Sequence, residues 1–440
     1  MRENPLPESG GPPWRTWQKV LFRFFFIYFL LLMDPIDWIP TFPGLRTIQH
    51  WYAVAVDWLV VTADAHILHI RPRGPVPTND GSGDTSYDWA TLYTFLLAAA
   101  AGCLVWSLID RKRGSYRKLG YVLRTALRYY IAAVALSYGI IKLFALQMPF
   151  PLLSQLATPL GDFLPMRLSW MFIGYSTHYE FFSGVMEVLT GLLLIYRRTV
   201  TLGLLAGGAV FFNVMMLNLS YDIPVKIFSI EMVVCCLFLL APDYKRLLSF
   251  FVLNRPSGTV SLYDPPFAGW KIRVARIVLK AAFLIIAVIM PFYQSQQRYA
   301  SSSKRHSPGP FDQKVYAVSV FAVNKDTIPS TYADTLRWKD VIFEGNGLGS
   351  ADTRDTLFRQ RYKRGYFTYQ MDTVHHVIGI KKSYRDSTFL MQLRYAFSDS
   401  NTIRCWTALR GDSLYLVLRR TDRHFQLAER QFHWVSEANR

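Results

Sequence analysis

Long apolar runs dominate the first 293 positions of the chain, and polar residues gather in the short segments between them. Seven such runs stand out, and most of them have roughly the 18–22 residues that a helix needs to cross a bilayer. They predict spans at about 17–34, 89–109, 126–147, 178–196, 199–219, 227–242 and 273–293. The first run continues into Asp34-Pro35 and lacks the small residues of a signal-peptide cleavage site, so we expect it to stay in the protein.

One further apolar segment, residues 47–69, contains Asp57, Asp64 and three histidines. Its Trp51 and Trp58 suit a membrane–water interface, so we predict a helix that lies on the outer surface. The alternative is an eighth span, which would move the C-terminal part of the chain to the other side of the membrane. Residues 71–86 are rich in Gly, Pro, Ser and Asp, which predicts a flexible outer loop.

After residue 309 the pattern changes to short runs in which apolar and polar residues alternate, such as "VYAVSVFAV" and "FLMQLRYAF". Turn-forming clusters such as "EGNGLGSAD" separate them. This pattern predicts an antiparallel β-barrel or β-sandwich of about eight to ten strands.

The fold class is therefore a membrane α-helical bundle of about seven spans with a C-terminal β domain. Five domains are predicted. They are N-terminal spans with an outer segment and loop (1–125), a four-helix membrane unit (126–242), a cytoplasmic loop with the last span (243–293), a linker (294–309) and an external β domain (310–440).

The distribution of charged residues predicts the orientation of the chain in the membrane. The formal net charge is +18, yet only 18% of residues are charged, below the roughly 25% of soluble domains. Much of the excess Lys and Arg lies in short loops on one side of the predicted spans, which the positive-inside rule makes cytoplasmic. We therefore expect membrane lipids as partners and no nucleic acid. In a bacterial-type inner membrane the N-terminus would be cytoplasmic and everything after Tyr293 periplasmic.

The metal-binding residue types form no convincing site in the sequence. The four cysteines include no CxxC pair, which argues against a redox pair or a zinc knuckle. His66 and His69 share one helix face, but a metal site needs three or four ligands and no third stands out. We therefore predict no metal.

Two opposite charges fall deep inside predicted spans. Glu187 lies ten residues before Arg197, which places it ~15 Å from the cytoplasmic edge of a ~30 Å apolar layer. Lys142, counted from Arg128, lies ~21 Å from the same edge. A lone charge at this depth costs at least ~2.5–3.5 kcal/mol, so we predict a Lys142–Glu187 ion pair.

Other polar residues are predicted to share the outer half of the membrane with this pair and to line a pocket open to the outside. Asn213 lies ~22 Å from the cytoplasmic edge, and Glu231 lies ~6–8 Å below the outer boundary. The loop "NLSYDIPVK" would form a lid. The remaining pocket candidates are Tyr138, Tyr221, Asp222 and Lys226. The open alternative is that the buried pair serves only to hold helices together.

The segments "YGIIKLFALQMP" and "GVMEVLTGLLLIYRRTVTLGLLAG" carry a G-x-x-K element at Gly139 and Lys142 and a G-x-x-E-x-x-x-G element at Gly184, Glu187 and Gly191. Arg198-Thr199 follows as a short turn. With these motifs, residues 126–242 resemble the DoxX family of small four-helix membrane proteins. The resemblance implies a redox or quinone-linked role in the membrane. The chain departs from the family by its added spans and its large β domain.

Two functional classes remain open. In the first, the chain is a quinone-linked redox subunit in which Lys142 and Glu187 manage a proton. Because the sequence has no haem ligand pair, iron–sulfur cysteine set or flavin motif, its electron partner would be a separate periplasmic or membrane redox protein. In the second, the chain is a non-catalytic scaffold or assembly factor whose β domain binds a periplasmic protein or a lipid-like ligand. A transporter ranks lowest, because broken helices near the midplane are not apparent.

Overall fold

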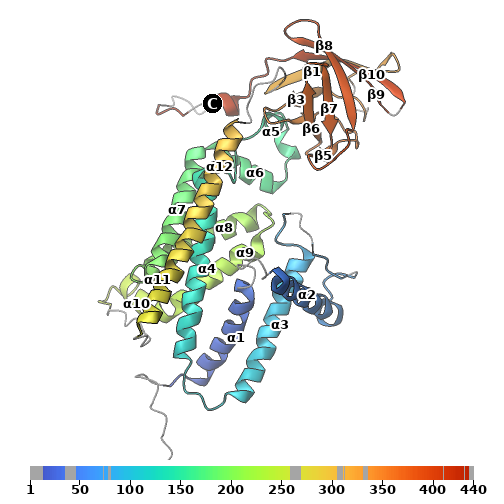
Figure 1. Cartoon of the computed structure of the whole chain (residues 1–440). Helices are drawn as coiled ribbons and strands as arrows, with labels where there is room; N and C mark the ends of the chain where they lie inside the picture. The colour runs from blue at the N-terminus through green and yellow to red at the C-terminus, as the bar shows by residue number, and fades with distance from the viewer. Residues whose placement is uncertain are drawn as a thin grey trace, which may run out of the picture. The chain divides into compact units, whose positions relative to one another are not determined.

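The computed structural model describes residues 13–34, 46–72, 74–77, 81–257, 269–304, 311, 313–330, 335–409, 411–430 and 432–435. The chain divides into two compact units (Figure 1). The helical unit comprises Met1–Leu143 and Phe181–Phe292, and the barrel unit comprises Phe144–Glu180 and Tyr293–Arg440.

The helical unit contains the predicted long helices. Eight helices in the described residues are long and apolar enough to cross a membrane, and they include the segment Thr47–Leu68. The helices are α1 (Thr16–Met33), α2 (Arg46–Ala63) with a π-helical end η1 (Asp64–Leu68), α3 (Ser86–Ile109), α4 (Arg117–Leu143), α7 (Thr177–Ile195), α8 (Val200–Ser220), α9 (Lys226–Leu240) with the short turn η3 (Ala241–Asp243), α10 (Tyr244–Phe251), and α11 (Trp270–Leu284), which continues through η4 (Ile285–Ile289) into α12 (Met290–Lys304).

Neighbouring helices α1 and α3 run antiparallel. A Cβ at Gly102 of α3 would lie 2.7 Å from Ile27 Cδ1, in the second half of α1. Arg23 of α1 donates to the Ser107 hydroxyl of α3 at 2.9 Å. The first half of α1 therefore lies beside the last turns of α3, which constrains the path of the chain between them.

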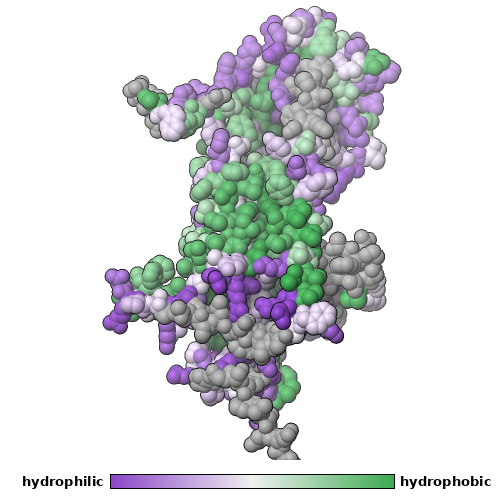
Figure 2. Space-filling model, turned by 60° about the vertical axis from the view of Figure 1, so that its left-hand side comes forward, coloured by the Kyte–Doolittle hydropathy of each residue, from purple (hydrophilic) through white to green (hydrophobic). Residues whose placement is uncertain are grey.

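Large apolar side chains gather in a broad band on the face of the molecule shown in Figure 2, and many exposed apolar residues belong to the helical unit. Helix α11 is the clearest case, because Ile277 and Leu279 are 69% and 70% exposed. Only 6% of the most apolar window in Trp270–Ser301 is buried within the chain. Such surfaces are expected where a helix contacts lipid instead of protein.

The last long helix continues into the predicted linker. Residues 294–309 were expected to form an irregular connection, but helix α12 extends to Lys304. Between Pro291 and Ser307 the sequence contains no proline or glycine that would end a helix. Pro291 itself follows the π-helical turn η4 (Ile285–Ile289), a local widening that accommodates a proline ring and its missing N–H.

The barrel unit is an antiparallel sheet closed on itself, which confirms the β-barrel among the predicted alternatives. Eight strands follow one another around the barrel, and β10 pairs with β1 to close it. They are β1 (Lys314–Val323), β3 (Asp340–Phe343), β4 (Leu348–Ala351), β6 (Arg364–Asp372), β7 (Val377–Lys381), β8 (Met391–Phe397), β9 (Thr402–Leu409) and β10 (Asp412–Arg420). Two short strands, β2 (Asp326–Thr327) and β5 (Arg359–Arg361), pair with β1 and β6.

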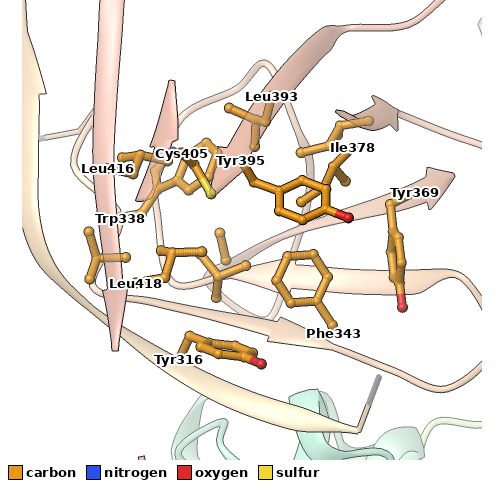
Figure 3. Close-up of a cluster of buried hydrophobic side chains, with 14 of the residues drawn as sticks. Tyr316, Trp338, Phe343, Tyr369, Ile378, Leu393, Tyr395, Cys405, Leu416 and Leu418 are labelled. Atoms are coloured by element: carbon orange, nitrogen blue, oxygen red, sulfur yellow. The ribbon is translucent and has the colours of Figure 1, made fainter. Parts of the chain in front are cut away.

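Side chains fill the interior of this barrel (Figure 3). Tyr316, Phe343, Tyr369 and Tyr395 are each less than 8% exposed, and Cys405 is fully buried among them. An eight-stranded barrel has an interior just wide enough for side chains. The aromatic residues at alternate positions of the strands occupy that space, so the barrel is a packed core.

The segment between α4 and α7 belongs to the barrel unit. It contains α5 (Leu153–Leu156), the turn η2 (Leu160–Asp162) and α6 (Pro165–Tyr175). Both the amide and the hydroxyl of Ser154 donate to Glu344 Oε1, at 2.8 and 2.7 Å. Ser350 donates to the Ser154 hydroxyl at 2.8 Å, and all three residues are buried. The compact units therefore differ from the predicted boundaries, which kept residues 126–242 together.

Candidate functional site

Helices α4 and α7 approach each other closely at two glycines. A Cβ at Gly139 would lie 2.9 Å from the carbonyl oxygen of Gly184 and 2.8 Å from the amide nitrogen of Val188. A Cβ at Gly184 would lie 2.7 Å from the carbonyl oxygen of Gly139. Only residues without a Cβ allow this backbone contact, as in other close crossings of membrane helices.

The same crossing brings the two predicted charges together. Lys142 Nζ donates to Glu187 Oε1 in an ion pair, and the residues are 5% and 2% exposed. Each charged residue follows its glycine by three positions, so it lies on the same helix face. The glycine contact thus sets the helix separation at which the pair forms. The depth argument from the sequence correctly identified these two partners.

One oxygen of the pair is left over. Glu187 Oε2 is buried and accepts no hydrogen bond from any described residue. A buried acceptor without a donor costs about 1–3 kcal/mol, and more when it is charged. Such an oxygen is suited to accept a hydrogen bond from a hydroxyl that enters the site, or to carry a proton.

Tyr138 is a further predicted candidate on the same helix as Lys142. It lies on α4 one turn before Lys142, within electrostatic range of Glu187, and is 40% exposed. Its ring packs 6.0 Å from that of Phe228 on α9. Tyr138 is therefore an exposed residue in the neighbourhood of the buried pair, and among the described residues no hydrogen bond joins it to that pair.

Glu231 belongs to a second polar site. Its Oε1 accepts a hydrogen bond from Tyr28 of α1 at 3.1 Å, and Tyr130 of α4 lies within electrostatic range. Among the described residues, no hydrogen bond or ion pair joins Glu231 to Lys142 or Glu187. The predicted four-residue cluster is therefore two sites, because depth alone does not give the direction in which a helix presents a side chain.

Asn213 does not take part in either site. It is exposed on α8, away from the helix contacts. The buried amide of this helix is Asn218, whose Nδ2 donates to the Val225 carbonyl at 3.2 Å. A separation of five residues along a helix corresponds to a rotation of about 140° around the helix axis, so the two amides lie on different faces.

The predicted lid is tied down by a residue that the sequence analysis missed. Asp84 accepts from the backbone amides of Lys226 and Ile227 at 2.8 and 3.0 Å, and so caps the start of α9. Lys226 forms ion pairs with Asp222 at 2.8 Å and with Asp84 at 3.5 Å. Tyr221 is 36% exposed at the end of α8. The loop is therefore anchored to the N-terminal part of the helical unit. The sequence feature that could have indicated this contact is the Asp-Thr-Ser run at the start of α3.

Two cavities stand out in the described residues, and neither is lined by Lys142 or Glu187. One, of about 530 Å³, is an apolar groove between α1, α4 and the end of α9. Its walls include Trp14, Trp17 and Phe25, with Arg117 and Arg124 as its cations. The other, of about 230 Å³, is polar and lies in the barrel unit. The predicted outward-opening pocket at the ion pair is therefore not among them.

Comparison with known proteins adds a partial similarity. The chain is 36% identical over 84 residues to the uncharacterised protein YwoB of Bacillus subtilis (strain 168), a match that covers 19% of this chain and 54% of YwoB. The chain thus spans about half the length of this curated relative. No family model matches the chain. No solved structure matches it.

Proposed function

We propose that this chain is a DoxX-like integral membrane protein with a quinone-linked redox role, in which the Lys142–Glu187 pair holds a proton. The observation that carries the proposal is Glu187 Oε2, a buried acceptor that no described residue satisfies. Intramembrane ionisable residues usually mark functional sites, and here they coincide with the G-x-x-K and G-x-x-E elements of the resemblance.

Lys142 and Glu187 would have different roles in this chemistry. Lys142 holds Glu187 Oε1 and fixes the carboxylate in one orientation. Oε2 would accept a hydrogen bond from a quinol hydroxyl that reached the pair, and it would hold the proton of that hydroxyl. A bound quinone supplies two-electron, two-proton chemistry. The electrons require a separate redox partner protein, since the sequence carries no motif for a resident electron cofactor.

The orientation of the chain is part of the proposal. If α2 crossed the membrane, α1 and α3 would run parallel, but they run antiparallel, with Ile27 against Gly102 and Arg23 against Ser107. This geometry supports an α2 that has both ends on the outer side, despite its span-like length. Seven crossings then place the N-terminus in the cytoplasm and the barrel in the periplasm. Alkaline phosphatase fused after Arg440 should be active in cells, whereas fluorescence from a green fluorescent protein fusion there would contradict the orientation.

The redox proposal is tested by quinol binding to the full chain in lipid nanodiscs. Titration with decylubiquinol should saturate, and Glu187→Gln should weaken binding by about tenfold or more, since it removes a charged acceptor. Glu231→Gln is the matched control, because it changes another intramembrane carboxylate that belongs to the Tyr28 site. Equal affinity of Glu187→Gln and wild type, or no binding by wild type, would overturn the proposal.

A scaffold role is the second candidate, and the C-terminal end of the barrel unit favours it. Three apolar side chains near this end are strongly exposed: Phe432 at 74%, Trp434 at 92% and Val435 at 74%. An exposed apolar cluster of this kind is typical of an interaction surface. A photo-cross-linking residue in place of Trp434 should capture one periplasmic protein in cells, and Phe432→Ala should abolish that product. Cross-links to lipid alone, or none, would contradict a scaffold at this surface.

A further inference from the structure

Helix α6 (Pro165–Tyr175), with the residue before it, presents an apolar stripe that is largely exposed. Leu164, Leu168, Phe172 and Tyr175 recur at intervals of three and four residues, so they lie on one helix face. Leu164 and Phe172 are 64% and 72% exposed. Only Ser176 separates α6 from α7, a candidate membrane span that begins at Thr177. If α7 enters the bilayer at Thr177, the end of α6 lies at the membrane boundary, where an exposed apolar stripe is suited to contact the apolar layer.

The segment that carries α6 also contacts the barrel. Arg167 Nε donates to the Tyr362 hydroxyl at 3.2 Å, and the Phe163 ring packs 5.0 Å from the Tyr362 ring. Tyr362 and Lys363 form the turn between β5 and β6, and both have positive φ. Lys363 forms an ion pair with Asp162 at 2.5 Å. These contacts hold one turn of the barrel against the helix at the membrane boundary.

The polar cavity of about 230 Å³ lies at this junction, lined by Pro159 and Asp162 from the α6 segment and by barrel residues. Its charged residues are six cations and three carboxylates: Arg337, Lys339, Arg354, Lys363, Arg364 and Arg423 against Asp162, Asp340 and Asp352.

The carboxylates do not cancel this positive charge. Asp340 is engaged by Arg364, at 2.5 Å, and Asp162 by Lys363. Burial, reinforced by neighbouring Asp340, raises the pKa of Asp352, while Arg364, Lys339 and Arg354 act in the opposite direction. With six cations against three carboxylates, the cavity keeps an excess of positive charge and is suited to an anion.

We propose that this cavity binds the phosphate of a lipid headgroup while the α6 stripe lies in the apolar layer below it. Arg354 and Arg423 are exposed at the cavity and supply guanidinium groups, which match phosphate oxygens in a bidentate way. Arg337 and Arg364 are buried and donate to protein groups, so they shape the wall. The proposal requires that α7 enters the bilayer, and it is independent of a redox role for Lys142 and Glu187.

The test uses the full chain in an uncharged detergent, titrated with dihexanoyl phosphatidylglycerol, with dihexanoylglycerol and with inorganic phosphate. The phospholipid should bind and dihexanoylglycerol should not. The double variant Arg354→Gln/Arg423→Gln should weaken phospholipid binding by more than about tenfold, because two charged contacts are lost. Arg394→Gln/Arg404→Gln is the matched control, since these arginines are exposed on β8 and β9 outside the cavity lining and should bind like wild type. Asp352→Asn should bind more tightly.

Three results would overturn the proposal. The first is no phospholipid binding by wild type, and the second is unchanged affinity in the Arg354/Arg423 variant. The third is inorganic phosphate binding as tightly as the phospholipid, which would identify a free anion as the ligand. None of these results affects quinol binding at Glu187, so the two proposals fail separately.

Discussion

Removing one member of the Lys142–Glu187 pair should destabilise the helical unit far more than removing both. The two side chains are 5% and 2% exposed, and the backbones of α4 and α7 are in contact beside them. Lys142→Met leaves the Glu187 carboxylate without its described donor, and Glu187→Leu leaves a lone ammonium group. Each single change is expected to cost about 3–5 kcal/mol, the range for breaking a buried pair. The double variant should lie within about 1 kcal/mol of wild type, because two apolar side chains replace two charges.

Unfolding by sodium dodecyl sulfate in mixed micelles gives the free energies for this cycle. Far-UV ellipticity near 222 nm (a helix signal) follows the helical unit, because the barrel contributes little there. The coupling free energy should reach about 2 kcal/mol or more. Asn213→Leu is the control for a polar residue inside the same layer, and it should leave stability unchanged or higher, because Asn213 is exposed on α8. Single variants as stable as the double variant would refute the reasoning, since the charges would then not depend on each other.

Three further predictions concern positions around the pair and in the barrel. Gly184→Ala should cost about 1–3 kcal/mol in the same assay, because its methyl group would meet backbone atoms, whereas Gly208→Ala, in open space, should be tolerated. Asp84→Ala should cost about 0.5–2 kcal/mol by uncapping α9, and Asp84→Asn should recover part of that loss. Since the pKa of Asp352 is raised in the folded barrel, its ionisation destabilises the fold, and stability should fall as pH rises through the folded pKa. Asp352→Asn should remove this fall, which melting temperatures of wild type and variant between acid and neutral pH would reveal.

The sequence contained enough to predict the long helices, an antiparallel β domain (as a barrel or a sandwich) and the ion pair. Apolar runs and period-two alternation are local signals, and the depth of Lys142 and Glu187 follows from counting residues along a helix. The direction of a side chain around its helix is different, because it depends on which neighbour the helix packs against. For this reason Asn213 was predicted to line the pocket, and Asn218 was not identified as the buried amide of α8. The contacts of Asp84 with Lys226 and of Ser154 with Glu344 join positions 142 and 190 residues apart, and no local pattern identifies such partners.

The bond between Ser154 and Glu344 has a consequence for how the protein is made. Ribosomes add about 5–20 residues each second, so the serine leaves the ribosome roughly 10–40 s before its partner exists, given their separation of 190 residues. During that interval α5 has no barrel to contact, and the spans from α7 onward must insert while it waits. A nascent chain stalled before residue 344 should therefore expose this segment to added protease, and completing synthesis should protect it.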